Sequence, residues 1–460
     1  MKAKKLIELG VPSGLPLKAV IAALPELGAQ GIRGREMRQL IADMAVNPEA
    51  FCDHPQLGKA AALMLKVESF VPRQELAPWR RWGEDLDEAA IKQLDQACSL
   101  PVSVAGALMP DAHMGYGLPI GGVLATRGAV IPYAVGMDIA CRMRLSVLDW
   151  PVEALQEREE QLVEALQRET RFGVGAKFAG RDRRDHQVME EEWDFIPLLA
   201  GQKDQAWAQL GSSGSGNHFA EFGPLTVEEG EGAELGLEPG TYLALLTHSG
   251  SRGSGAKVAT HFSRLAQDLH PELPRELSRL AWLDMDSEEG QGYWQAMELM
   301  GKYAAANHEL IHGHVLAALG AAARVSVENH HNFAWIEEHG GEQVVVHRKG
   351  ATPAGEGVLG VIPGSMGTPG YVVRGLGVAA SLNSASHGAG RAMSRTEAKR
   401  RFNWSQARAF LKKRGVRLIS AGLDEVPMAY KPIEQVMAAQ RDLVQPIARF
   451  DPRLVKMAAG

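Results

Sequence analysis

The spacing of apolar residues changes several times along the chain. Residues 1–70 place apolar side chains every three to four positions, interrupted by Pro and Gly, which predicts a set of short helices. From about residue 98 to 149, and again at 242–249, short β-prone runs lie between glycines and predict strands joined by tight loops. Helical spacing returns at 151–171 and at 287–319.

Strand-like and helical segments follow one another without regular alternation, and no fixed-period repeat is visible. This pattern does not favour a doubly wound parallel sheet. The runs at 344–350 and 357–364 predict strands beside Gly-rich loops, and the charged stretch 181–194 predicts an exposed connection. We therefore expect an α+β protein, with a helical N-terminal segment (1–75). One mixed domain (76–460) follows, with a β-sheet core, flanking helices and many Gly-rich loops.

Composition adds two local features to an ordinary globular average of 45% hydrophobic and 23% charged residues. The 50 glycines are about 11% of the chain, against a usual value near 7%, which indicates places where backbone approaches a ligand. The net charge of -6 argues against overall attraction to nucleic acid. However, residues 391–417 contain ten basic residues and one acidic residue, together with Phe402 and Trp404, which predicts a track for a phosphate backbone.

Cysteine content and hydropathy bear on the compartment. Cys52, Cys98 and Cys141 show no paired spacing, which is typical of a reducing compartment. The N-terminal residues lack the apolar run of a signal peptide, and no uncharged apolar stretch of 18 residues is present. We expect a cytoplasmic protein that is neither exported nor inserted into a membrane.

Candidate metal ligands lie in Gly-rich and Ser-rich segments. Asp138 and Cys141 are three residues apart, a spacing that lets a carboxylate and a thiolate converge on one ion. Carboxylate, thiolate and imidazole ligands together suit Mn²⁺, Fe²⁺, Co²⁺ or Zn²⁺ and suit Ca²⁺ poorly. One thiolate can also bridge two ions. The candidate histidines in similar loops are His218, His248, His330, His331, His347 and His387.

A second motif leaves another function open. His308 and His312 fit the HExxH pattern, which on a helix holds zinc with Glu309 as general base, and Glu328 could supply a third ligand. This pattern predicts a zinc peptidase, although five residues are easily matched by chance.

His387 has the surroundings of a nucleophile. It lies between Ser386 and Gly388, and Arg391 follows four residues later. Small neighbours expose backbone N–H groups, so a histidine here can attack a phosphorus atom while the charge of the product is held. Residues 362–367 (IPGSMG) offer a similar nest of backbone donors.

Most of the candidate residues lie in nine short sequence blocks between about residues 99 and 432. The blocks are MPDAHMGYGLPIGG, VGMDIAC, GSGNHFAE, HSGSRG, HNFA, HRKGAT, IPGSMG, SASHGAGRAMSR and DEVPMAYK. In their residues and in their order, these blocks resemble the RtcB family of GTP-dependent RNA ligases.

The resemblance implies a reaction and two metal ions for residues 76–460. Mn²⁺ is the family's metal, His387 is implied as the nucleophile that takes GMP from GTP, and an RNA 3′-phosphate then receives the guanylyl group. A 5′-hydroxyl end attacks the activated end, and a 2′,3′-cyclic phosphate is first opened by a metal-activated water. The implied ligands are Asp138, Cys141 and His218 for one ion and Cys141, His248 and His331 for the other.

The resemblance also implies the residues that contact the nucleotide. Tyr430 would stack on guanine, Lys456 approximates the family's C-terminal guanine-contacting lysine, and Gly370 stands where a serine commonly contacts guanine. The implied set is Asn217, His218, Phe219, Ala220, Glu221, His331, Asn332, Pro363, Gly364, Ser365, Met366, Gly370, His387, Gly388, Ala389, Gly390, Tyr430 and Lys456.

Several residues depart from the family's pattern without changing a ligand. Ala140 and Arg142 stand where Asn and Gly are usual, and Pro353 replaces an Arg. Arg142 and Gly370 leave a second hypothesis open, in which a protein of the same fold binds metal and RNA ends without joining them.

Overall fold

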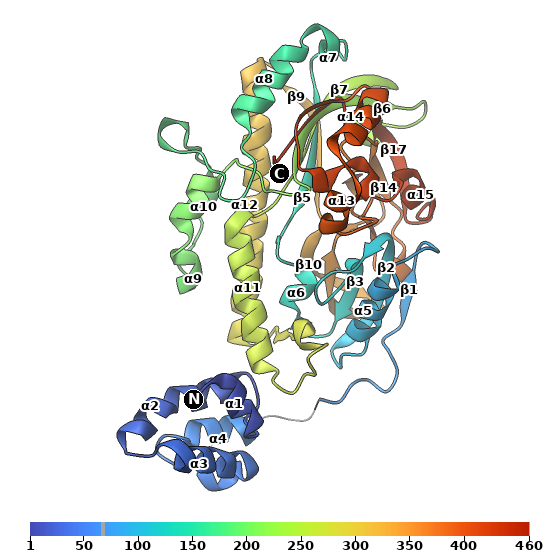
Figure 1. The fold of residues 1–460 in the computed structure, drawn as a ribbon. Helices are drawn as coiled ribbons and strands as arrows, with labels where there is room; N and C mark the ends of the chain where they lie inside the picture. Colours follow the sequence, from blue (N-terminus) through green and yellow to red (C-terminus); the bar gives the residue numbers. More distant parts are fainter. Residues whose placement is uncertain (66–69, 460) are drawn as a thin grey trace.

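The computed structural model describes residues 1–65 and 70–459 and shows a mixed α+β fold (Figure 1). Most strands belong to a five-stranded and a nine-stranded sheet, and almost all neighbouring strands are antiparallel. This confirms the predicted α+β class and excludes a doubly wound parallel sheet.

The five-stranded sheet carries helix α5 (Glu88–Cys98) on β2, and α5 begins where the Asp87 side chain accepts a hydrogen bond from the backbone of Ala89. The parallel pair β1 and β2 lies at one edge of the sheet. Its strands, in spatial order, are β1 (Trp79–Arg81), β2 (Ser103–His113), β3 (Ile120–Thr126), β11 (Glu342–Lys349) and β10 (Asn332–His339).

The nine-stranded sheet is the larger one, and its residue pairing fixes where the ends of distant segments meet. The path of strands is β13 (Leu359–Ile362), β14 (Gly370–Gly375), β17 (Val444–Phe450), β6 (Phe219–Val227), β7 (Gly240–Ser249), β5 (Arg142–Leu148) and β9 (Ala323–His330). Beside this path, β18 (Leu454–Met457) pairs with β6, and β16 (Arg417–Ser420) pairs with β18.

Four helices at the N-terminus have an apolar cluster of their own, which includes Leu6, Leu27 and Ile41. Figure 1 shows them as a separate group beside the end of α11 (Arg252–Leu269), where Lys18 forms an ion pair with Asp268. The four are α1 (Ala3–Glu8), α2 (Leu15–Ala29), α3 (Gly34–Val46) and α4 (Gly58–Leu65), which confirms the predicted helices. Their division from the rest as a domain stays a prediction.

The long helix α12 (Glu288–Leu319) packs against β5 and β7 of the nine-stranded sheet and against α11. The Ser287 hydroxyl accepts a hydrogen bond from the Gly290 backbone at its start, and Gly320 ends it in a left-handed conformation.

Among the described residues, no helix is both long and apolar enough to cross a membrane. The remaining helices are α6 (Pro132–Val135), α7 (Ala154–Glu157), α8 (Glu159–Glu169), α9 (Pro197–Ala200), α10 (Lys203–Gln209), α13 (Arg395–Arg401), α14 (Trp404–Lys413) and α15 (Ile433–Ala438). Two short ladders pair β4 (Ala129–Val130) with β8 (Leu283–Asp284) and β12 (Ala351–Pro353) with β15 (Ser384–Ser386).

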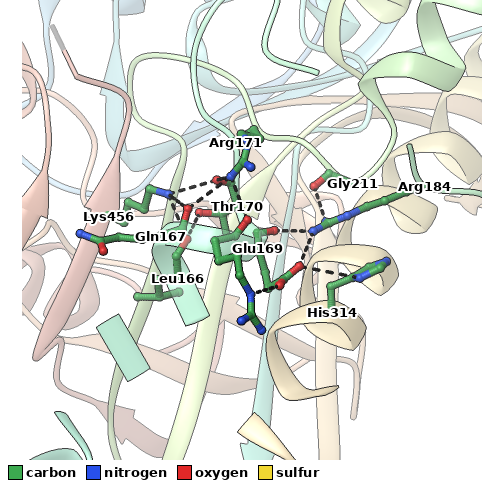
Figure 2. Close-up of polar contacts among 10 residues, drawn as sticks. Leu166, Gln167, Glu169, Thr170, Arg171, Arg184, Gly211, His314 and Lys456 are labelled. Carbon is green, nitrogen blue, oxygen red and sulfur yellow. Dashed lines mark hydrogen bonds and ion pairs between the residues drawn. The ribbon is translucent and has the colours of Figure 1, made fainter. Parts of the chain in front are cut away.

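Cationic side chains hold the C-terminal end of α8 (Figure 2). The Lys456 ammonium donates to the backbone carbonyls of Leu166, Gln167 and Thr170 at 2.9, 3.2 and 3.0 Å. Arg171 also bonds to carbonyls of this last turn. Helix C-terminal carbonyls lack partners within the helix and carry partial negative charge, so these contacts stabilise the end of α8.

Most of the stretch 181–194 is exposed, as its charge predicted, but a few of its residues are buried. Trp193 is 1% exposed, and its indole N–H donates to the carbonyl of Val188. Arg184 is 4% exposed. The prediction holds for the other charged residues of the stretch, whereas the Arg184 guanidinium lies inside the protein with a specific set of acceptors.

Those acceptors lie on two separate segments (Figure 2). Arg184 donates to the carbonyl of Glu169 at 2.7 Å, to its carboxylate at 3.2 Å, and to the carbonyl of Gly211 at 3.0 Å. Its guanidinium also lies 3.8 Å from the ring centre of Phe178. Arg184 therefore ties the end of α8 to the loop that begins at Gly211.

We expect Arg184→Met to lower the free energy of unfolding by about 3 kcal/mol, because it leaves the buried Gly211 carbonyl without its donor and removes one of the two arginines that pair with the Glu169 carboxylate. Urea denaturation followed by circular dichroism measures this change. The matched control is Arg181→Met, which removes an exposed charge from the same segment and should change stability by less than about 0.5 kcal/mol. Equal stability of the two variants would contradict the role assigned to Arg184.

Candidate active site

Four candidate ligands meet because four strands of the nine-stranded sheet are neighbours in fixed register. Arg142 at the start of β5 pairs with Ser249 on β7 and with His330 on β9, while Phe219 at the start of β6 pairs with His248. Strand ends that pair in this way lie at the same edge of a sheet. The candidate ligands lie at this edge: Cys141 precedes β5, His331 follows β9, His218 precedes β6, and His248 is the second-to-last residue of β7.

The ligand atoms form two groups that share one sulfur. Cys141 Sγ lies 3.3 Å from His218 Nε2, which in turn lies 3.0 Å from the Asp138 carboxylate. On the other side, Cys141 Sγ lies 3.0 Å from His248 Nε2, and His248 Nε2 lies 3.3 Å from His331 Nε2. Both groups have the geometry to hold a metal ion, and they combine the same side chains that the resemblance assigns to each ion.

The protonation states of these buried groups fit divalent cations. Burial lowers the pKa of His248 to about 3 and that of His331 well below its usual value, so both imidazoles are neutral and can donate a lone pair. His248 is also oriented, because its Nδ1–H donates to the Asn217 carbonyl at 3.0 Å and leaves Nε2 facing the sulfur. Burial and the Asp138 carboxylate raise the pKa of the Cys141 thiol, which makes a cation necessary for a thiolate here.

His387 is held by a buried carboxylate. Asp111, which is fully buried on β2, accepts hydrogen bonds from His387 Nδ1 at 2.7 Å and from the His387 backbone at 3.2 Å. An Nδ1–H that donates to a carboxylate leaves Nε2 with the free lone pair of a nucleophile. The His387 ring centre lies 4.9 Å from that of His331, so the nucleophile candidate adjoins the second ligand group.

A cavity of about 420 Å³ joins the ligands to His387. It brings together most of the residues that the resemblance implied for the nucleotide. These are Asn217, Phe219, His331, Asn332, Pro363, Gly364, Ser365, Met366, His387, Gly388, Ala389, Gly390 and Tyr430.

The structure does not bring every implied residue to this cavity. Ala220 and Glu221 are buried within β6, and Gly370 begins β14 behind Pro363. Lys456 is directed to the end of α8, whereas the next residue on β18, Met457, lines the cavity. Successive side chains of a strand point to opposite faces, so only one of these two neighbours can reach the nucleotide side.

The cavity also contains two charged residues that the sequence pattern did not single out, Lys349 and Glu425. Lys349, from the HRKGAT block, donates to the Tyr133 carbonyl at 2.9 Å, and burial lowers its pKa to about 7. Arg391 and Arg395 form ion pairs with Glu425. Asp111 lies in the first motif block, and only the three-dimensional contact with His387 reveals what it does.

Tyr430 lies against the same ion pairs. Its hydroxyl donates to the Glu425 carboxylate, and the Arg391 guanidinium lies 5.3 Å from its ring centre. Tyr430 therefore lines the cavity with its ring orientation fixed from two sides.

The HExxH histidines do not form a metal site. On α12, His308 Nδ1 and His312 Nε2 both bond to the Thr247 hydroxyl, at 2.7 and 2.8 Å. Glu309 faces solvent and contacts His186. Within the described residues, only the two groups that share Cys141 could hold an ion. The two histidines instead support β7 one residue before His248.

Comparison with known proteins identifies the family of this chain. The family described as tRNA-splicing ligase RtcB matches residues 93–197 and 197–457. The RNA-splicing ligase RtcB of Escherichia coli K12 is 34% identical over 405 residues, covering 81% of this chain and 95% of the relative. The tRNA-splicing ligase RtcB of Thermococcus kodakarensis is 32% identical over 455 residues, covering 82% and 93%. The RNA-splicing ligase RtcB of Mycobacterium tuberculosis is 33% identical over 428 residues, covering 78% and 98%. The chain belongs to the RtcB family of RNA-splicing ligases.

Proposed function

We propose that this protein uses GTP to join RNA ends, and that it links a 3′-phosphate or 2′,3′-cyclic phosphate end to a 5′-hydroxyl end. The observation that carries the proposal is the hydrogen bond between Asp111 and His387 beside the ligand groups that share Cys141. An oriented imidazole next to two cation sites is an arrangement suited to transfer of a phosphoryl or nucleotidyl group.

We assign two Mn²⁺ ions to the ligand groups, with Mn²⁺ taken from the resemblance. One ion would be held by Asp138, Cys141 and His218, and the other by Cys141, His248 and His331. Bound ions would neutralise the triphosphate and polarise its phosphoryl oxygens. The mixed oxygen, sulfur and nitrogen donors suit a transition metal better than Ca²⁺.

His387 then acts as the nucleophile. Its Nε2 attacks the α-phosphorus of GTP, a P–N bond forms, the bond between the α-phosphorus and its bridging oxygen breaks, and pyrophosphate leaves. Asp111 keeps the proton on Nδ1 and stabilises the positive charge that develops on the ring. We assign the phosphate oxygens to the backbone N–H groups of Gly388 and Gly390 and to the Arg391 guanidinium, which line the cavity, because the Ala389 N–H already donates to the Pro363 carbonyl.

Two transfers complete the reaction. An oxygen of the RNA 3′-phosphate attacks the phosphorus of the GMP adduct, and the P–N bond to His387 breaks. The 5′-hydroxyl of the second end then attacks the activated 3′-phosphate, a phosphodiester forms, and GMP leaves. A 2′,3′-cyclic phosphate end must first be opened by water to give the 3′-phosphate.

The non-ligating alternative rested on Arg142 and Gly370. The Arg142 guanidinium is turned away from the cavity toward α12, where it donates to the Gly301 carbonyl at 3.3 Å and lies 3.6 Å from Glu328. Gly370 lies behind Pro363 and does not line the cavity. Neither residue obstructs the nucleotide side, so the ligase hypothesis is favoured over the accessory-protein hypothesis.

We place this reaction in the cytoplasm because the Cys141 sulfur has to remain reduced to serve as a thiolate ligand of both ions. All three cysteines are free in the structure. A reducing compartment protects such a ligand from oxidation.

Replacement of the shared ligand is expected to affect both ions. Cys141→Ser should weaken binding of both Mn²⁺ ions by more than about 100-fold, beyond the 10–100-fold that loss of an outer-shell partner typically causes. Asp138→Asn should weaken one ion and leave the other, because Asp138 belongs to one group only. Equilibrium dialysis with metal analysis measures both stoichiometries. Cys52→Ser, which changes an exposed cysteine, is the control, and two tightly bound ions in Cys141→Ser would exclude a shared thiolate.

Incubation with Mn²⁺ and GTP labelled at the α-phosphate should give a covalent, acid-labile GMP adduct. His387→Ala should abolish the adduct and lower the rate of RNA joining by more than about 1,000-fold, because the P–N bond can no longer form. His261→Ala, a change of an exposed histidine on α11, should leave both unchanged. An adduct that persists in His387→Ala would remove the nucleophile assignment. Adduct formation without joined RNA on any broken-stem substrate would favour the accessory protein.

A further inference from the structure

A second pocket, of about 660 Å³, lies between α14 and β16 outside the site described above. Trp404, Arg408 and Lys412 line it from α14, and Leu418 lines it from β16. Its volume falls within the range of pockets that bind small molecules or single nucleotides.

Two of the three cations at this pocket are free of ion pairs with the described residues, unlike half of those in the basic segment 391–417. Arg408 and Lys412 are exposed and form no ion pair with any described residue. Arg417 also lines the pocket, but Glu159 and Glu160 on α8 already neutralise it. The cations that do form ion pairs are Arg391, Arg395, Lys399, Arg400 and Arg417.

The floor of the pocket is apolar. Leu411, Val416 and Ala421 are buried there, and the half-buried Trp404 packs against the same cluster. An aromatic ring beside an apolar floor provides a surface on which a base can stack, and this contribution does not depend on the identity of the base.

The same apolar cluster separates this pocket from the active-site cavity. Met366, Met457 and Phe219 belong to the cluster and line the active-site cavity, whereas Leu411 and Val416 line the second pocket. The two pockets therefore share a wall.

The basic segment connects the two pockets along the chain. Arg391 and Arg395 line the active-site cavity, and Arg408 and Lys412 line the second pocket. A polynucleotide strand whose end lies in the active-site cavity would therefore meet cationic side chains of this one segment at both pockets.

We propose that the second pocket binds a nucleotide of the RNA strand at a distance from the ends that react. The base packs against Trp404 and the apolar floor, and Arg408 and Lys412 bind the flanking phosphates. The identity of the ligand as RNA rests on the proposed function. An acidic peptide would also satisfy the two cations, but it would leave the apolar floor and the indole without a planar partner.

Binding of RNA can be measured without catalysis. We compare the full-length protein with Arg408→Gln/Lys412→Gln and with a matched control, Arg401→Gln/Lys413→Gln. The control removes the same charge from the same region at exposed positions that line neither pocket. The probe is a fluorescent 12-nucleotide single-stranded RNA with a 3′-phosphate, followed by anisotropy over a range of salt concentrations.

We expect the pocket variant to bind this RNA about tenfold more weakly and the control to stay within about twofold of the unmodified protein. The slope of log Kd against log salt should fall by about 1.4 in the pocket variant, or 0.7 for each lost phosphate contact. Equal affinities of the pocket variant and the unmodified protein would overturn the proposal. Equal weakening in both variants would overturn it as well, because it would indicate overall charge and not this pocket. Displacement of the RNA by a polyglutamate peptide at equal charge concentration would favour a peptide as the occupant and would also overturn it.

The GMP adduct separates this proposal from the proposed function. It forms before RNA binds, so Arg408→Gln/Lys412→Gln should form it at the unmodified rate while the KM for RNA rises. Absence of the adduct in the unmodified protein would contradict the ligase hypothesis. The anisotropy result would then still test whether RNA binds at the second pocket.

Discussion

The antiparallel register of β6, β7, β5 and β9 is the constraint on which the site depends. It brings residues that lie up to 190 positions apart in the sequence, Cys141 and His331, to one edge of one sheet. A shift of one residue in any of these pairings would turn a ligand to the opposite face. The buried histidines of α12 support this edge through Thr247, so the longest helix also serves the register.

Burial then determines what these side chains can do. Imidazoles kept neutral by desolvation donate lone pairs, and a thiol whose pKa is raised needs a cation before it ionises. Burying the charged forms of these side chains without a metal ion would be unfavourable, whereas their neutral imidazoles and shared sulfur are well suited to bind one. Asp111 follows the same principle, because a fully buried carboxylate requires a strong donor and receives one from His387.

The sequence was sufficient for the fold class and for residues whose chemistry is local. Loop histidines beside glycines stood out from the average, and α12 follows from helical spacing with a Ser at its start and a Gly at its end. Other features depend on contacts that no local pattern encodes. Strand alternation puts Lys456 and Met457 on opposite faces, but only the contact with α8 shows which face Lys456 takes. Arg184 is buried because its acceptors lie on two distant segments. His308 and His312 match a zinc motif, yet Thr247 lies where the metal would have to be.

The cations of the basic segment 391–417 differ in whether they form ion pairs, and this difference follows their positions. Within the active-site cavity, Arg391 and Arg395 both pair with Glu425, and Arg395 also pairs with Asp424, so two carboxylates orient the two guanidinium groups and offset their charge. Outside it, Arg408 and Lys412 have no acidic partner among the described residues and attract anions over a Debye length of about 8 Å at physiological salt. The chain has a net charge of -6, yet residues 391–417 concentrate ten basic side chains in one segment that attracts polyanions. Charge segregation, and not average charge, decides where a nucleic acid can approach this protein.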